Sequence, residues 1–139
     1  MLGLGLLLIR LVIGLSFMAH GAQKLFGSFG GGGIKVFGEH FEKLGIKPGV
    51  TMALLAGLSE FIGGALFTLG LLTPLAGIVI AGSMVVAILK VHGPNGYWLT
   101  KGGYEYCLAI LVVAIGVALT GAGHYSLDAI LFILNYINF

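Results

Sequence analysis

Four long apolar stretches occupy most of this 139-residue chain and restrict its fold more than any other feature. They cover residues 4–20, 50–72, 74–91 and 104–120, and a helix of about 20 apolar residues crosses the hydrocarbon core of a bilayer. Because that core offers no water to backbone polar groups, such stretches must be helical. We therefore expect an all-α integral membrane four-helix bundle, formed as a single domain by residues 1–139.

The composition agrees with a membrane protein and excludes several other classes. Hydrophobic residues make up 58% of the chain and charged residues only 9%, unlike a soluble domain. The net charge of +2 is too small to indicate nucleic-acid binding. The single cysteine, Cys107, cannot form an internal disulfide, which excludes dithiol chemistry within the chain, and we interpret it as a small apolar packing residue.

Lysines predict the orientation of the bundle. Four of them (Lys24, Lys35, Lys43 and Lys47) follow the first stretch, and two (Lys90 and Lys101) flank the loop after the third. Positively charged loops face the cytoplasm, so both termini are expected outside. The first stretch reads as an uncleaved span rather than a signal peptide.

Two further segments are too short or too polar to span. Residues 34–44 place Phe37, Phe41 and Leu44 on one helical face, which predicts an amphipathic helix in the cytoplasmic interface. It is either a passive surface helix or a lid over a lateral opening. The tail over 126–139 predicts a half-helix capped by Ser126, with Asp128 in its first turn.

Arg10 and Glu60 are charged residues inside apolar stretches. Each lies ten residues from the predicted cytoplasmic end of its span, or about 15 Å deep, so we expect them to pair. Such residues normally face the bundle interior and mark a site. The pair is interpreted either as a structural lock between the first two spans or as part of a ligand-binding or proton-handling site.

A second polar group is expected where three spans reach the cytoplasmic side. Its members can exchange protons or donate and accept hydrogen bonds, and so suit the mouth of a pocket for a polar head group. They are His20, Gln23, Lys24, His92, Tyr104 and Glu105. Haem held by His20 and His92, or a metal bound by these histidines and Glu105, is disfavoured because the histidines lie at helix ends and show no diagnostic spacing.

Several short motifs distributed along the chain carry a family resemblance. They are Arg10, His20-Gly21-Ala22-Gln23-Lys24-Leu25-Phe26-Gly27, Glu60-Phe61-Ile62-Gly63-Gly64, Gly70-Leu71-Leu72-Thr73-Pro74, Gly102-Gly103-Tyr104-Glu105-Tyr106 and Gly121-Ala122-Gly123-His124-Tyr125-Ser126-Leu127-Asp128. In combination they resemble the DoxX family, in particular its bacterial branch associated with quinone and catechol stress. The resemblance implies a four-helix protein of the bacterial cytoplasmic membrane with a redox role.

Both lines of reasoning suggest a protein that binds a quinone or similar redox molecule and acts in quinone, catechol or thiol stress. Glu60 and Arg10, or His20 and Glu105, would exchange protons and stabilise anions, and the polar group at the mouth would bind the ligand. A soluble cytoplasmic partner would supply electrons, because no flavin or nicotinamide fold fits in these helices.

Two alternatives remain, a non-enzymatic scaffold or assembly factor for a redox complex and a small transporter. The chain also has small-residue faces that suit either a homodimer interface or internal packing.

Overall fold

The computed structural model describes residues 1–137, and the elements within them are helical. The α-helices are α1 (Leu2–Phe26), α2 (Gly33–Lys43), α3 (Gly49–Leu69), α4 (Thr73–Ala87), α5 (Glu105–Thr120) and α6 (Leu127–Ile137). A π-helical turn, η2 (Ile88–His92), continues α4, and the short 3-10 turns η1 (Ser28–Gly30), η3 (Gly93–Asn95) and η4 (Leu99–Lys101) lie in the connections.

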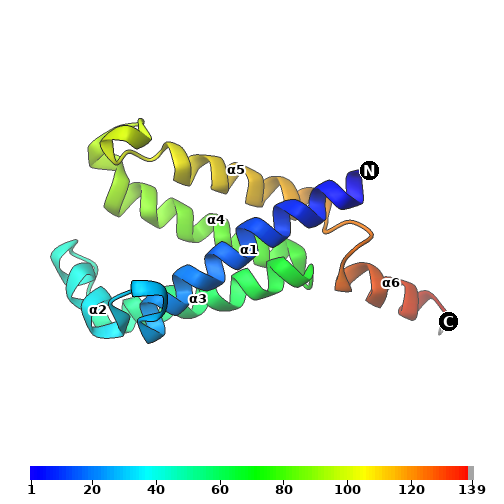
Figure 1. Cartoon of the computed structure of the whole chain (residues 1–139), viewed down its shortest axis with the longest axis horizontal. Helices are drawn as coiled ribbons and strands as arrows, with labels where there is room; N and C mark the ends of the chain where they lie inside the picture. Colours follow the sequence, from blue (N-terminus) through cyan, green and yellow to red (C-terminus); the bar gives the residue numbers. More distant parts are fainter. Residues whose placement is uncertain (138–139) are drawn as a thin grey trace.

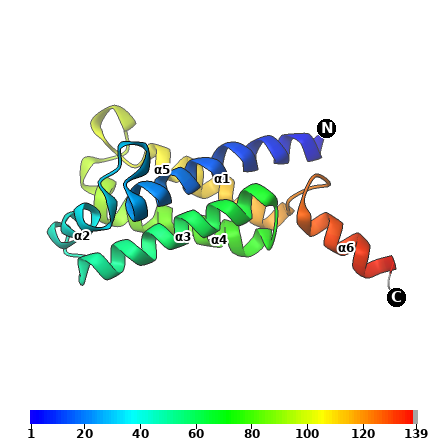
Figure 2. The same cartoon turned by 60° about the horizontal axis from the view of Figure 1, so that its bottom comes forward.

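Within this part of the chain, three helical segments are long and apolar enough to cross a membrane: residues 2–26, 49–69 and 73–95. The fourth predicted span corresponds to α5, whose 16 residues extend for about 24 Å. It runs beside α4 (Figure 1). Met1 and α6 lie at one end of the bundle and α2 at the other (Figures 1 and 2). The predicted all-α membrane bundle, with a helix between the first two spans and a short C-terminal helix, is confirmed.

The helices pack as two antiparallel pairs, α1 with α3 and α4 with α5, joined where α3 contacts α4 (Figure 1). Glycines allow α1 and α3 to approach closely. A Cβ atom on Gly14 would lie 2.8 Å from the carbonyl oxygen of Gly64, and one on Gly21 would lie 2.7 Å from that of Gly57. These backbone contacts fix the register between the two helices.

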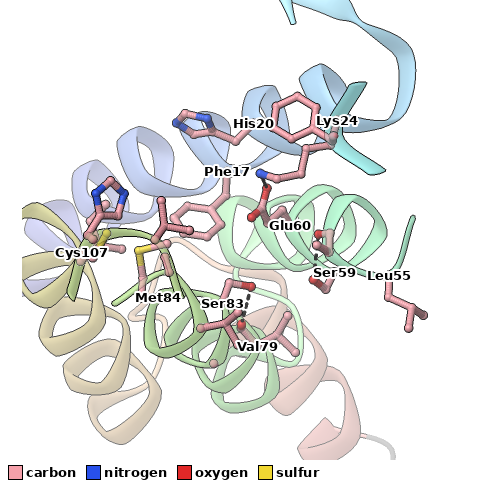
Figure 3. Close-up of a pocket in the computed structure, with 18 of the residues that line it drawn as sticks. Phe17, His20, Lys24, Leu55, Ser59, Glu60, Val79, Ser83, Met84 and Cys107 are labelled. Atoms are coloured by element: carbon pink, nitrogen blue, oxygen red, sulfur yellow. Dashed lines mark hydrogen bonds and ion pairs between the residues drawn. The ribbon is translucent and has the colours of Figure 1, made fainter. Parts of the chain in front are cut away.

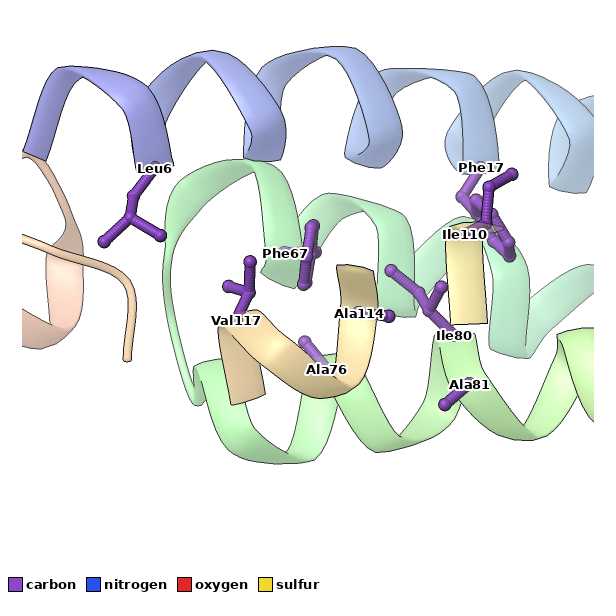
Figure 4. Close-up of a cluster of buried hydrophobic side chains, with 9 residues drawn as sticks. All are labelled: Leu6, Phe17, Phe67, Ala76, Ile80, Ala81, Ile110, Ala114 and Val117. Atoms are coloured by element: carbon purple, nitrogen blue, oxygen red, sulfur yellow. The ribbon is translucent and has the colours of Figure 1, made fainter. Parts of the chain in front are cut away.

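The apolar core fills the middle of the bundle, between the two pairs. Phe67, Ile80, Ala76 and Ala114 are completely buried there, and Figure 4 shows them meeting from α3, α4 and α5. Towards the α2 end, the α1–α3 pair and the α4–α5 pair diverge (Figure 1). The core therefore does not extend through that end.

Helix α2, whose bounds lie close to those of the helix predicted over residues 34–44, packs on the start of α3. Gly38 contacts the beginning of α3 so closely that a Cβ atom there would lie 2.7 Å from Val50. The Gly49 amide donates a hydrogen bond of 2.7 Å to the Glu42 carboxylate. Together these contacts hold α2 against the α1–α3 pair at the diverging end of the bundle.

Candidate ligand cavity

The diverging end of the bundle contains a cavity of about 820 Å³. Its walls come from α1, α3, α4 and α5, and Phe37 and Phe41 of α2 cover one end. Most of the lining is aliphatic or aromatic, with Phe17 and Met84 projecting into the space (Figure 3). The volume falls within the usual range of small-molecule sites, about 300–1,000 Å³.

The principal polar feature of the wall is an ion pair between Lys24 of α1 and Glu60 of α3. Lys24 Nζ lies 2.6 Å from Glu60 Oε2, and the two side chains are 15% and 11% exposed. Lys24 Nζ also sits 5.3 Å from the centroid of the Phe37 ring, which adds a cation–π contact. A charged pair is therefore held in a largely apolar cavity (Figure 3).

Three histidines line the cavity: His20 and His92, which were predicted as site residues, and His40 of α2, which was not. His20 comes from α1 and His92 from η2. His92 Nδ1 lies 2.8 Å from the Gly102 carbonyl oxygen. Because a carbonyl only accepts hydrogen bonds, Nδ1 carries the proton in this contact, and Nε2 of the neutral ring is left as a proton acceptor.

Four of the predicted site residues, His20, Lys24, Glu60 and His92, thus meet at one cavity. Sequence reasoning missed several polar or sulfur-containing neighbours, among them Ser59, Ser83 and Cys107. The serine hydroxyls donate to carbonyl oxygens of their own helices, at 2.9 Å and 3.2 Å. Both serines carry a hydroxyl group within an apolar span, and this was the sequence signal that could have identified them. Cys107 is buried as predicted, but its side chain also borders the cavity.

The other residues predicted at the mouth of the pocket make contacts with loop residues and do not line the cavity. Gln23 Nε2 donates to the Phe29 carbonyl oxygen at 3.4 Å. Glu105 accepts a hydrogen bond of 3.0 Å from the Leu99 amide. Tyr104 packs edge-on against Tyr97, with ring centroids 5.6 Å apart. None of the three belongs to the cavity wall.

The predicted pairing of Arg10 with Glu60 is wrong. Arg10 is completely buried and donates to the carbonyl oxygens of Thr68, at 3.0 Å, and Tyr125. The prediction took His20 as the end of the first span, whereas α1 continues to Phe26. Arg10 consequently lies level with Thr68, two helical turns, or about 12 Å, further along α3 than Glu60.

Arg10 belongs to a polar junction at the α6 end of the bundle. There, Asp128 accepts hydrogen bonds from the amides of Leu72, at 2.8 Å, and Thr73, at 2.9 Å. The Asp128 amide donates to the Gly70 carbonyl oxygen at 2.8 Å. The carboxylate therefore caps the start of α4 and ties α6 to the turn before it.

The surroundings of Asp128 favour its ionised form. Burial alone would raise the pKa of the carboxyl, but this is outweighed by Thr73, Leu72 and the positive charge of Arg10, so the pKa lies below its ordinary value. The amides of Thr73 and Leu72, which donate to the carboxylate, are the hydrogen-bond partners seen in the geometry. The junction stabilises the structure far from the cavity.

Across the part of the chain that the structure describes, no three His, Cys, Asp or Glu side chains gather as a metal-binding group. Of the three residues considered above as metal ligands, His20 and His92 line the cavity, whereas Glu105 accepts a hydrogen bond from the Leu99 amide at the η4 turn.

Apolar helices of membrane-spanning length around a ligand-sized cavity define a multi-pass helical membrane protein. The DoxX family model matches residues 5–93, and the chain belongs to the DoxX family. The matched segment contains His20, Lys24, Glu60 and His92, whereas Cys107 lies beyond it.

Two relatives cover most of the chain. The protein named "Putative oxidoreductase CatD" of Bacillus subtilis (strain 168) is 32% identical over 129 residues, which is 93% of this chain and 88% of that protein. The "Uncharacterized membrane protein Rv3486" of Mycobacterium tuberculosis (strain ATCC 25618 / H37Rv) is 32% identical over 132 residues, 86% of this chain and 77% of that protein. No solved structure matches the chain.

Proposed function

We propose that this protein binds a quinone, or a similar lipophilic redox molecule, in the cavity at the α2 end. The observation that supports this most directly is the Lys24–Glu60 ion pair, held at 2.6 Å inside a space of about 820 Å³ with mainly apolar walls. An apolar space suits the ring of such a ligand, and a few convergent polar groups suit its oxygens. The oxidoreductase name of the Bacillus subtilis relative agrees with a redox role.

The chemistry assigns separate roles to the polar residues. Reduction of one quinone to its hydroquinone consumes two electrons and two protons. Lys24 would stabilise negative charge on a ligand oxygen, while Glu60, His20 and His92 would transfer protons. The electrons would come from a soluble protein that carries a flavin or nicotinamide cofactor. With these roles, this membrane protein would act in quinone, catechol or thiol stress.

The α2 end would face the cytoplasm of a bacterial cell. Exposed lysines at that end, among them Lys35, Lys43, Lys90 and Lys101, carry most of the positive charge of the chain, and cytoplasmic loops are enriched in lysine and arginine. This orientation would present the cavity to a soluble electron donor and leave both termini outside.

Quinone binding is tested with purified protein in lipid nanodiscs. We expect extracted lipid to contain quinone in stoichiometric amounts, and Glu60→Gln and His20→Ala to reduce it. Glu39→Gln is the matched control, because Glu39 is exposed on α2 and does not line the cavity. Quinone-free wild-type protein that also fails to take up added quinone would refute the proposal.

A scaffold that organises a redox complex is the second candidate. The exposed aromatic loop with Tyr97 and Trp98, which are 42% and 60% accessible, favours it because such a loop can contact a partner or the membrane interface. Exchange of the charges, Lys24→Glu with Glu60→Lys, separates the two functions. A scaffold should tolerate the exchange, whereas a proton-handling ligand site should lose quinone or catechol tolerance in cells.

A further inference from the structure

A second hollow adjoins the cavity on the outside of the bundle. This groove has a volume of about 350 Å³ and lies between α3 and α4. It shares Leu55, Ser59 and Val79 with the cavity, and Figure 3 shows these three side chains on the α3 and α4 side of the close-up. The two spaces therefore adjoin each other at these three side chains.

The groove differs from the cavity in chemistry. Apart from Ser59 and Gly63, its wall consists of large aliphatic side chains, including Leu58, Ile62 and Leu75. Ser59 donates its hydroxyl proton to its own helix, and no ionisable residue lines the groove. A polar or charged ligand would therefore find no hydrogen-bond donor or ionic partner in the groove.

The shape of the groove suits a chain rather than a ring. It follows α3 from Leu55 to Leu66, a length of about 16 Å. Gly63 lets α3 and α4 approach closely at the groove, because a Cβ atom at this position would lie 2.9 Å from Val79 Cγ1. A flexible hydrocarbon chain of a few isoprene units fits these dimensions.

Because the groove adjoins the cavity, we infer that the ligand is a membrane-borne quinone with an isoprenoid tail, whose ring occupies the cavity and whose tail lies in the α3–α4 groove. The inference rests on the proposed function and narrows its ligand class. A small water-soluble quinone or catechol would fill only the cavity and leave the groove to lipid. Leu58, Ile62 and Leu75 are 39%, 52% and 53% exposed, so the tail would enter sideways from the bilayer.

The test is photo-crosslinking in proteoliposomes with a benzoquinone whose isoprenoid tail carries a diazirine. We expect labelled peptides to map to residues 55–66 and 75–79. Excess tailless benzoquinone should compete with the label, since both ligands need the same ring site.

A matched pair of variants distinguishes the groove from the general lipid surface. Leu58→Trp places a larger side chain in the groove, and we expect it to lower groove labelling by about tenfold because the tail would be overpacked there. Leu54→Trp makes the same change one helical turn away, at a side chain that is 43% exposed and borders neither space. It should leave the labelling unchanged.

Each alternative outcome has a defined meaning. Label on other lipid-facing positions, with competition by the tailless quinone retained, would overturn the tail assignment while the ring site stands. Groove label that no quinone displaces would show that the groove holds bulk lipid, and would overturn the assignment as well. Absence of saturable labelling together with absence of tailless-quinone binding would refute the proposed function itself.

Discussion

Replacement of Gly21 by alanine tests whether the α1–α3 backbone contact positions the ion pair. The added Cβ atom would lie 2.6 Å from the Phe61 amide nitrogen and 2.7 Å from the Gly57 carbonyl oxygen. Helix backbones cannot yield as a flexible side chain does, so α1 and α3 must separate by about 1 Å to reach normal contact distance. Lys24 lies less than one turn along α1, and this movement would lengthen its 2.6 Å contact with Glu60.

Gly5 provides the matched control on the same helix, because a Cβ atom there meets nothing within 4 Å. The gain in helix propensity from glycine to alanine is common to both variants and cancels in the comparison. We therefore expect Gly21→Ala to be less stable than Gly5→Ala by about 1–3 kcal/mol, the usual cost of overpacking.

Unfolding in mixed detergent micelles measures this difference, and quinone uptake reports on the cavity. Gly21→Ala should also lower quinone uptake, while Gly5→Ala should not. Equal stability and equal uptake in the two variants would refute the reasoning, since it would mean that the close helix contact neither restricts α1 nor positions Lys24.

Three further predictions concern individual side chains. A double-mutant cycle with Lys24→Met and Glu60→Gln should give a favourable coupling free energy of about 2 kcal/mol, and a value near zero would mean that the pair does not form in the membrane. Because the pKa of Asp128 in the folded protein lies below its ordinary value, its stabilisation of the α4–α6 junction is complete well above that ordinary value and is lost as the pH falls through the lowered pKa. The protection of α6 amides, measured as hydrogen exchange relative to the intrinsic rate at each pH, should therefore fall in acid in the wild type and be low at all pH values in Asp128→Asn, whereas protection at neutral pH unchanged by this substitution would contradict the junction. Bound quinone should slow alkylation of Cys107 by N-ethylmaleimide, measured by mass spectrometry, and equal rates with and without quinone would place the ligand elsewhere.

The helices themselves were predictable because their apolar runs respond to the bilayer directly. Residues 50–72 and 74–91 correspond closely to α3 and α4, and the pattern of Phe37, Phe41 and Leu44 predicted α2 within one residue at each end. The end of α1 was not predictable in the same way. His20 looked like the last residue of the span, but the helix continues to Phe26 because it packs on α3.

The candidate site was predictable only in part, for a reason of geometry. His20, Lys24, Glu60 and His92 were identified because polar groups near apolar spans are conspicuous, and all four line the cavity. Glu105 was equally conspicuous, yet its carboxylate does not line the cavity and instead accepts a hydrogen bond from the Leu99 amide. A sequence shows which side chains can bind a ligand, but loop hydrogen bonds decide which of them remain available.

The sequence by itself determined that this chain lies in a membrane as a helical bundle with its lysine-rich loops at one end, because burial of apolar residues and backbone hydrogen bonding depend on local composition. Only the tertiary structure decided that Glu60 pairs with Lys24 and that Arg10 joins the Asp128 junction. That choice depends on the register of α1 against α3, which the close contacts of Gly14 and Gly21 set. The cavity likewise arises from the divergence of two helix pairs (Figure 1), a property of their packing that no single helix encodes.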